Sequence, residues 1–242
     1  MNQWDERFSA EEYVYGTKPN AFLEEQLPLL NPGTILFACE GEGRNAVFAA
    51  SLGWNVCAFD GSIKGREKAL KLADQNGVSI DYRIGDATEI EYPTESFDCI
   101  VFIYAHFPTD IRTFIHRRSL QWLKSGGTII MEAFNPAQIP NSSGGPKDIT
   151  MLYTPAMLME DFIDLSYLSV SMETVILDEG PLHQGMAEVI RMIGKNRFHD
   201  TISLMQIPLF CIHDLFTTSQ TPPYWTSSRC YCRLCLLCHL WL

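Results

Sequence analysis

Two glycines stand close together in residues 41–46, which read GEGRNA and precede a stretch with helical periodicity. Glycine lets the backbone approach a ligand closely, and the start of a helix presents N–H groups that have no partner within the helix. Such a turn can cradle the polar parts of a nucleotide-like ligand. An ordinary tight turn between a strand and a helix has the same appearance, so Gly41 and Gly43 need support from the surrounding sequence.

Acidic residues follow two further predicted strands. Asp60 lies 20 positions after Glu40, where an acid commonly accepts hydrogen bonds from both hydroxyls of a ribose. A third predicted strand leads into Gly85, Asp86 and Ala87, which again places an acid at a strand end. Because the carboxyl ends of adjacent parallel strands meet in one crevice, these residues together predict a site for an adenosine-containing ligand.

Two cofactors fit this arrangement. Residues 41–46 satisfy the glycine pattern of dinucleotide-binding turns, but S-adenosylmethionine also contains a ribose and an adenine. A dinucleotide-dependent enzyme of the two-half type needs a second mononucleotide unit, whereas only a loop, one helix and a hairpin follow the fifth predicted strand before residue 196. We therefore expect S-adenosyl-L-methionine. The alternatives are an NAD(P)-dependent oxidoreductase and a non-catalytic S-adenosylmethionine-binding sensor.

An alternation of strands and helices must position these residues. Short apolar runs rich in β-branched and aromatic residues alternate with longer segments of helical period, which is typical of βαβ units around a parallel sheet. The predicted strands are residues 34–38, 55–59, 80–84, 98–103 and 128–134, followed by a hairpin of about 168–177 and 186–193. The predicted helices are residues 20–30, 44–52, 64–76, 109–123 and 156–164.

Particular residue types mark the predicted helix boundaries. Gly53 and Gly77 stand just past helix ends, where a left-handed backbone conformation is common. Thr154 is a candidate N-cap for the helix that follows it. Residues 125–127 (SGG) predict the end of the helix before the fifth strand, and residues 135–150 predict a loop.

Four stretches along the chain form an ordered set: residues 35–62 around the glycine turn, 85–87 (GDA), 97–100 (FDCI) and 122–128 (WLKSGGT). In this order they resemble the class I S-adenosylmethionine-dependent methyltransferases. Two N-terminal stretches, WDER at 4–7 and YVYGTKPN at 13–20, resemble the tellurite-resistance and thiopurine methyltransferase-like branch of that family. The resemblance covers residues 1–195.

The resemblance implies a fold and a set of ligand contacts. The fold is α/β, a Rossmann-like, doubly wound sheet of seven mostly parallel strands with one antiparallel strand and with helices on both faces. Asp60 would bind the ribose of S-adenosylmethionine, Asp86 and Ala87 would lie at its adenine, and the glycine turn would pass under its methionine part. The candidate cofactor-binding residues are Glu40, Gly41, Gly43, Arg44, Asp60, Asp86, Ala87 and Tyr104.

The first strand departs from the family pattern. Many members carry an acid at the position of Phe37 and a glycine at the position of Cys39. Glu40 is therefore the candidate to replace the missing carboxylate that binds the ammonium group of the ligand.

Methyl transfer from a sulfonium is an in-line displacement in which the cofactor supplies the reactive carbon and the protein mainly aligns the reactants. A base is needed only if the acceptor arrives protonated. His106, in the YAHFP stretch after the fourth strand, and His183, in the predicted hairpin loop, are the catalytic candidates. Either histidine could instead serve packing. Relatives act on soft sulfur, selenium or tellurium nucleophiles and on other small molecules, so we expect a small-molecule methyl acceptor.

Aromatic residues gather ahead of the first long predicted helix. Trp4, Tyr13 and Tyr15 precede Gly16 within residues 4–20. This composition predicts a lid over the cofactor.

Composition and charge indicate which kinds of binding partner and which location to expect. The chain of 242 residues has 18 basic and 29 acidic side chains and a net charge of −11, which argues against binding of nucleic acid through a basic face. The sequence contains no uninterrupted apolar run of the roughly 18 residues that a membrane-spanning helix needs. The N-terminus has neither a basic start nor an apolar run, so we expect no signal peptide and a cytoplasmic protein.

Residues 197–242 differ in composition from the rest. They hold five of the eight cysteines, namely Cys211, Cys230, Cys232, Cys235 and Cys238, and His239 follows the last of them. Thiolates and an imidazole can bind zinc, but structural zinc sites usually have two ligand pairs separated by a loop. We expect residues 1–196 to form the methyltransferase domain and 197–242 to lie outside its fold, without a metal.

Overall fold

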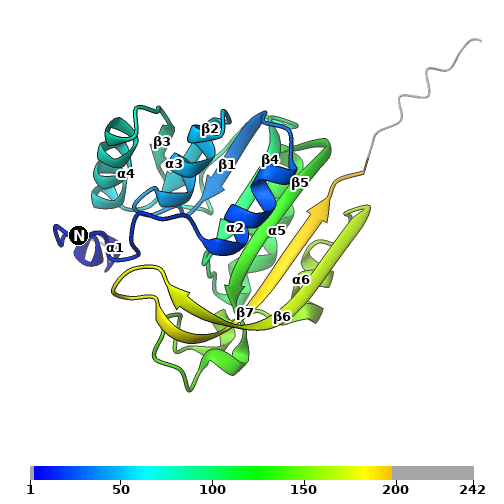
Figure 1. Cartoon of the computed structure of the whole chain (residues 1–242). Helices are drawn as coiled ribbons and strands as arrows, with labels where there is room; N and C mark the ends of the chain where they lie inside the picture. Colours follow the sequence, from blue (N-terminus) through cyan, green and yellow to red (C-terminus); the bar gives the residue numbers. More distant parts are fainter. Residues whose placement is uncertain (1–2, 198–242) are drawn as a thin grey trace, which may run out of the picture. The chain divides into compact units, whose positions relative to one another are not determined.

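The computed structural model describes residues 3–197, whose strands form one seven-stranded sheet in the order β3-β2-β1-β4-β5-β7-β6 (Figure 1). Strand β7 pairs antiparallel with both β5 and β6, and the other neighbouring strands pair in parallel. The strands are β1 (Thr34–Ala38), β2 (Asn55–Asp60), β3 (Asp81–Ile84), β4 (Phe97–Ile103), β5 (Leu123–Phe134), β6 (Tyr167–Asp178) and β7 (Gln184–Lys195). The predicted α/β, doubly wound fold with one antiparallel strand is confirmed.

Helices cover both faces of this sheet. One core cluster joins the sheet to α2, α3 and α4, and another joins its opposite face to α5 and α6. The helices are α1 (Gln3–Arg7), α2 (Ala21–Gln26), α3 (Arg44–Ser51), α4 (Ile63–Gln75), α5 (Thr109–Trp122) and α6 (Pro155–Asp161). Three short 3₁₀ helices are η1 (Leu27–Leu29), η2 (Pro136–Gln138) and η3 (Ile149–Met151).

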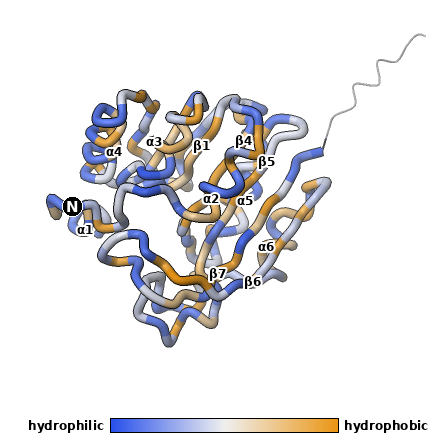
Figure 2. The backbone as a smooth tube through the Cα atoms, in the orientation of Figure 1, coloured by the Kyte–Doolittle hydropathy of each residue, from blue (hydrophilic) through white to orange (hydrophobic). Residues whose placement is uncertain are grey.

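The central strands are apolar along most of their length because both of their faces are covered (Figure 2). In β1, Leu36 packs toward α5 while its neighbours Ile35 and Phe37 pack toward α2 and α3. This alternation across the sheet explains why the sequence shows a continuous apolar run rather than a polar and apolar alternation.

Several predicted helix boundaries are confirmed. Gly53 and Gly77 have φ angles of +87° and +67° after α3 and α4, and the side chain of Thr154 accepts a hydrogen bond from the N–H of Met157. The predicted helix over 20–30 is shorter, because α2 ends at Gln26 and the chain continues as η1. Pro28 in η1 has no N–H to extend the α-helical hydrogen bonding.

The predicted break at residues 125–127 falls inside strand β5. Strand β5 begins at Leu123, directly after α5. Phe97 pairs with Leu123 but Cys99 pairs with Thr128, so the intervening residues of β5 form an irregular bulge. Gly126 adopts a φ of +73° there. The glycines therefore bend a strand, and no separate linker lies between helix and strand.

Candidate functional site

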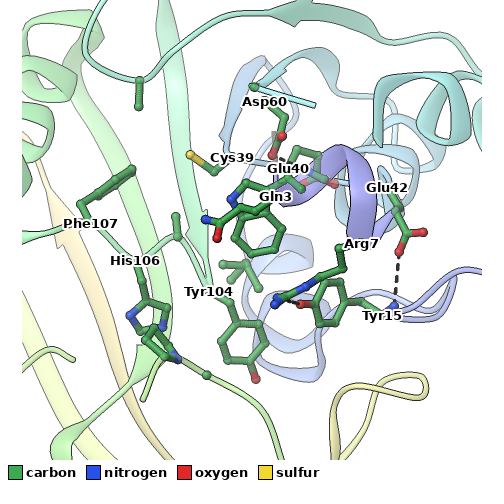
Figure 3. A pocket seen from close by; sticks show the side chains of 18 of the residues that line it. Gln3, Arg7, Tyr15, Cys39, Glu40, Glu42, Asp60, Tyr104, His106 and Phe107 are labelled. Atoms are coloured by element: carbon green, nitrogen blue, oxygen red, sulfur yellow. Dashed lines mark hydrogen bonds between the residues drawn. The ribbon is translucent and has the colours of Figure 1, made fainter. Parts of the chain in front are cut away.

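A cavity of about 670 Å³ opens at the carboxyl ends of the parallel strands, where the strand order reverses between β1 and β4. This is the expected place for a ligand in an open α/β sheet, and the volume is in the range of small-molecule sites. Figure 3 shows Asp60, Tyr104 and His106 arranged around one space, with Arg7 and Tyr15 beside it. Residues from the ends of β1, β2 and β4 thus line a single pocket.

Seven of the eight predicted cofactor-binding residues line this cavity, as do both predicted catalytic histidines. Gly43 is absent from the lining. Its φ is +88°, and a Cβ added there would lie 2.4 Å from the Cβ of Ala69 in α4. The second glycine of the turn therefore allows α3 to pack closely on α4. The lining residues from the predicted set are Glu40, Gly41, Arg44, Asp60, Asp86, Ala87, Tyr104, His106 and His183.

The carboxylate of Asp60 is fixed at the end of β2. Its Oδ2 accepts a hydrogen bond from the N–H of Gly41 (3.0 Å), and its Oδ1 accepts one from the N–H of Ser62 (2.8 Å). Burial raises its pKa, and these two hydrogen bonds oppose the effect. Each carboxylate oxygen has a second lone pair, so Asp60 retains the capacity to accept hydrogen bonds from a ligand.

Glu40 lies in the turn between β1 and α3, and its Oε1 accepts a hydrogen bond from the N–H of Ala46, in the first turn of α3, at 2.7 Å. Burial raises the pKa of Glu40 to about 7. A cation placed beside this carboxyl group would favour its ionised form. On the neighbouring strand end, Asp86 accepts hydrogen bonds from the N–H and the hydroxyl of Thr88, which lower its pKa.

The N-terminal segment covers one side of the cavity, in the place predicted for a lid. Trp4, Phe8 and Tyr15 are among its lining residues. Asp5 Oδ1 accepts hydrogen bonds from the hydroxyl of Ser62 and the N–H of Lys64, which attaches α1 to the start of α4. Further along, the N–H of Leu182 donates to the carbonyl of Val14, so the segment also meets the loop between β6 and β7.

His106 lines the cavity with both ring nitrogens already engaged. Nδ1 lies 2.7 Å from the carbonyl oxygen of Met151, and Nε2 lies 3.2 Å from the backbone nitrogen of Phe134. A carbonyl can only accept and a backbone N–H can only donate, so Nδ1 carries the hydrogen and Nε2 accepts. Burial lowers the pKa of His106 to about 4. The ring is therefore neutral, and its lone pair is used by the backbone.

His183 is held differently, in the loop between β6 and β7. Its Nδ1 lies 3.4 Å from Oε2 of Glu179. Within residues 3–197, no group forms a hydrogen bond with Nε2. Burial lowers the pKa of His183, and the neighbouring Glu179 opposes that shift.

A buried polar network connects this loop to the rest of the site. Arg44 Nη2 donates to Glu179 Oε2 at 2.7 Å, and Asn20 Nδ2 donates to Oε1 of the same residue at 3.0 Å. Asn20 Nδ2 also donates to Glu132 Oε1 (2.6 Å), which accepts the hydroxyl of Tyr104 as well (2.8 Å). The Nη1 group of Arg44 is buried without a partner among the described residues. This cation therefore has a donor available for an anionic ligand group.

The sequence analysis missed three members of this network, namely Asn20, Glu132 and Glu179. Glu132 carried a usable signal, since it interrupts an apolar strand and is only 1% exposed. An acid buried in a sheet must be paired, so its presence there indicates a polar network. Glu179 precedes His183 by four residues, but that spacing has meaning only once the loop conformation is known.

Two residues at the site have left-handed backbone conformations although they are not glycine. Cys39 after β1 has a φ of +56°, and Tyr104 after β4 has a φ of +53°. Both line the cavity. Such conformations cost energy for residues with a Cβ and are concentrated at functional sites.

Within residues 3–197, no group of three or more histidine, cysteine, aspartate or glutamate side chains could hold a metal ion. The cysteines and His239 of the tail, where we expect no metal, lie outside this part of the chain. None of the helices described is both long and apolar enough to span a bilayer.

Comparison with known proteins shows what part of the chain resembles. Residues 35–127 match the family model of a methyltransferase domain, whereas no curated protein matches the sequence. Three solved structures share the fold at low identity. A protein studied for the conversion of a disulfide bond into a thioacetal group during echinomycin biosynthesis has a TM-score of 0.61 and 16% identity, covering 82% of this chain and 92% of its own.

The second is an S-adenosylmethionine-dependent methyltransferase from Methanosarcina mazei, with a TM-score of 0.55 and 15% identity over 75% of this chain and 99% of that one. The third is TehB from Haemophilus influenzae, with a TM-score of 0.58 and 14% identity over 80% of this chain and 66% of that one. The family match runs from β1 into the start of β5 and includes part of the cavity lining, and the fold likeness extends beyond it. Residues 35–127 therefore resemble a methyltransferase domain, and the described part of the chain shares the Rossmann-like fold of these solved structures.

Proposed function

We propose that the protein is an S-adenosylmethionine-dependent methyltransferase that acts on a small-molecule acceptor. The observation that carries this proposal is the convergence of Gly41, Asp60 and Asp86 on one cavity at the strand-order reversal. Three strand ends contribute to it, as the binding of an adenosine-containing ligand requires. The match of residues 35–127 to a methyltransferase domain supports the same reading.

The residues present fit this cofactor. Asp60 would accept the ribose hydroxyls, and Asp86 with Ala87 would border the adenine. Glu40 would bind the ammonium group. Burial raises the pKa of this carboxyl group, and a cationic partner beside it would favour its ionised form. The unpartnered buried Nη1 of Arg44 is suited to the carboxylate at the same end of the ligand. When bound, S-adenosylmethionine supplies the activated methyl group.

The acceptor would occupy the part of the cavity lined by Tyr15, Tyr104, Phe134 and the two histidines. Of the two predicted catalytic residues, His183 is the better placed to take a proton. Its Nε2 has no protein partner in the described part of the chain, whereas the lone pair of His106 accepts a backbone hydrogen bond. His106 would instead fix the position of the acceptor by contact. Alignment of this kind can contribute several kcal/mol, up to about 7–11 kcal/mol in favourable reactions.

Several finer expectations are part of this proposal. Residues 1–196 would be sufficient for the activity, and the protein would act in the cytoplasm. The N-terminal resemblance favours a soft sulfur, selenium or tellurium acceptor. TehB does not single out this acceptor, because it is one of several structural neighbours with similar TM-scores. A cavity of this size would also admit an amine or a hydroxyl acceptor.

Titration calorimetry of the full chain with S-adenosylmethionine, and separately with NADH, tests the cofactor. We expect specific binding of the first and not of the second, and the reverse would favour an oxidoreductase. Transfer of a labelled methyl group is then screened with thiol, selenite, tellurite and amine acceptors. Binding of S-adenosylmethionine with no transfer to any of a broad acceptor panel would favour the sensor.

A further inference from the structure

Packing on several sides holds the imidazole ring of His183 in place. Its centroid lies 4.5 Å from that of Tyr15, 4.6 Å from that of Tyr104 and 5.5 Å from that of Phe134. On another side, the backbone of Gly144 is so close that an added Cβ would lie 2.6 Å from Cδ2 of the ring. The side chain is only 6% exposed. A ring confined in this way keeps one orientation, as a catalytic group requires.

The charge of Glu179 determines which nitrogen of this ring carries the hydrogen. Burial alone would raise the pKa of Glu179, but hydrogen bonds from His183 and Arg44 outweigh it and lower the pKa to about 2. An ionised carboxylate can only accept hydrogen bonds. Nδ1 of neutral His183 must therefore carry the hydrogen, and Nε2 holds the lone pair.

Glu179 is itself held on both oxygens. Oε2 accepts from Arg44 at 2.7 Å, and Oε1 accepts from Asn20 at 3.0 Å. The distance from Oε2 to Nδ1 of His183 is longer, at 3.4 Å. Hydrogen bonds of catalytic groups are often long in the ligand-free enzyme and shorten in the complex. The carboxylate is thus positioned to strengthen its bond to the ring when the ring gains a positive charge.

We infer that Glu179 is the positioning residue for His183 and that His183 removes a proton from the acceptor, whose attacking atom enters as a hydroxyl, a thiol or an ammonium group. This inference rests on the proposed methyltransferase function. The acceptor class is then one that needs a base, in contrast to a soft anion that is already a nucleophile. The other titratable or charged groups that act on this ring are Tyr15, Tyr104, His106, Arg44 and Arg7.

The chemical step balances with the groups present. The acceptor atom forms a bond to the methyl carbon while the bond from that carbon to the sulfonium sulfur breaks, and the electron pair stays on sulfur. The proton of the acceptor passes to Nε2 of His183. The imidazolium formed donates its Nδ1–H to the carboxylate of Glu179, which then pairs with the imidazolium as well as with Arg44. For a thiol or a hydroxyl, the methylated product leaves neutral.

The first experiment needs no acceptor. Nitrogen chemical shifts of the histidine rings in the full chain report which nitrogen is protonated, and His183→Gln assigns the signals. We expect the Nδ1–H form for His183 and a fall in its pKa in Glu179→Gln, because the carboxylate stabilises the charged ring. An Nε2–H form in the unsubstituted protein, or an unchanged pKa in Glu179→Gln, would overturn the inference.

The second experiment compares two probes that differ in protonation. Benzyl mercaptan is largely protonated at neutral pH, and 4-nitrothiophenol is largely ionised, so only the first needs a base. For Glu179→Gln we expect kcat with benzyl mercaptan to fall about 10- to 100-fold, a part of the roughly 100- to 10,000-fold that a general base supplies. We expect kcat with 4-nitrothiophenol and both KM values to change little. Glu160→Gln, on the exposed surface of α6, is the matched control.

The outcomes separate this inference from the proposed function. Equal loss with both probes would assign Glu179 a structural role and refute the inference while leaving the methyltransferase intact. If the unsubstituted chain does not bind S-adenosylmethionine in calorimetry, the proposed function itself is wrong. If the cofactor binds but neither thiol is methylated, the protonation state and the pKa of His183 from the first experiment decide whether Glu179 positions the ring.

Discussion

Replacing Gly43 by alanine should destabilise the fold through two separable effects. The left-handed φ of +88° costs a residue with a Cβ about 1–2 kcal/mol. The new methyl group would also stand 2.4 Å from the Cβ of Ala69, and overpacking of this kind costs about 1–3 kcal/mol. The sum of about 2–5 kcal/mol is a large part of the roughly 5–15 kcal/mol by which folded domains are stable.

Gly53 provides a matched control for the backbone effect. Its φ is +87°, and an added Cβ would meet no atom within 4 Å. Gly53→Ala should therefore cost only about 1–2 kcal/mol. Ala69→Gly removes the nearer of the two atoms that the new methyl group would meet within 3 Å, while the Cα of residue 69 stays at 2.7 Å. In that background, the cost of Gly43→Ala should fall but stay above that of Gly53→Ala, with a favourable coupling of about 0.5–3 kcal/mol.

Urea unfolding of the four variants measures these differences, provided that the m-values agree. Equal costs for Gly43→Ala and Gly53→Ala, or the absence of coupling to Ala69, would refute the packing argument. Calorimetry with S-adenosylmethionine on folded Gly43→Ala gives an independent check. A lost affinity in fully folded protein would assign Gly43 to ligand binding, as its sequence position alone suggests.

Four further predictions follow from the site and the core. Asp60→Ala should weaken S-adenosylmethionine binding by about 1–3 kcal/mol, the range for hydrogen bonds to a charged group, and unchanged affinity in calorimetry would remove Asp60 from the site. Deletion of residues 1–18 should lower both cofactor affinity and turnover, and full retention of both would refute the lid. A chain that ends at residue 196 should fold, bind the cofactor and be more soluble than the full chain. Stoichiometric zinc in the purified full chain, together with unfolding when the zinc is removed, would show that residues 197–242 belong to the fold and would refute this prediction. Burial raises the pKa of Asp161, but hydrogen bonds from His116 and other groups outweigh this and lower it. The ionised carboxylate therefore stabilises the fold above the unfolded pKa of about 3.9, and this stabilisation is lost as the pH falls below that value. Urea unfolding at decreasing pH should show the loss, and Asp161→Asn should make the free energy of unfolding depend less steeply on pH.

The sheet could be predicted from the sequence because its strands are buried on both faces. Residues 34–38 were predicted as a strand and form β1 with the same bounds. The glycines at 126 and 127 were misassigned because glycine serves equally in a helix end and in a bulge. The choice between them depends on the pairing of β5 with β4, which local sequence does not contain.

The site residues that follow from the order of strands and helices could be predicted. Those that depend on contacts between residues far apart in the sequence could not. Glu40, Asp60 and Asp86 follow strands, so the alternation of elements was sufficient to place them in one crevice. Asn20, in contrast, contacts acids that lie 112 and 159 residues further along the chain. No periodicity or motif indicates such a contact before the fold is known.

The meeting of the N-terminal segment with the loop between β6 and β7 has a consequence for the order of folding. Val14 and Leu182 are joined by a hydrogen bond, and the backbones of Gly16 and Gly180 approach so closely that neither tolerates an added Cβ without contact. Since β7 lies between β5 and β6, the last of the described strands to be synthesised occupies an interior place in the sheet. Chains on the ribosome fold as their segments emerge, at about 5–20 residues per second. The side of the cavity that holds His183 can form only after residues 180–183 have left the ribosome, so a nascent chain that has not yet released them has no complete binding site.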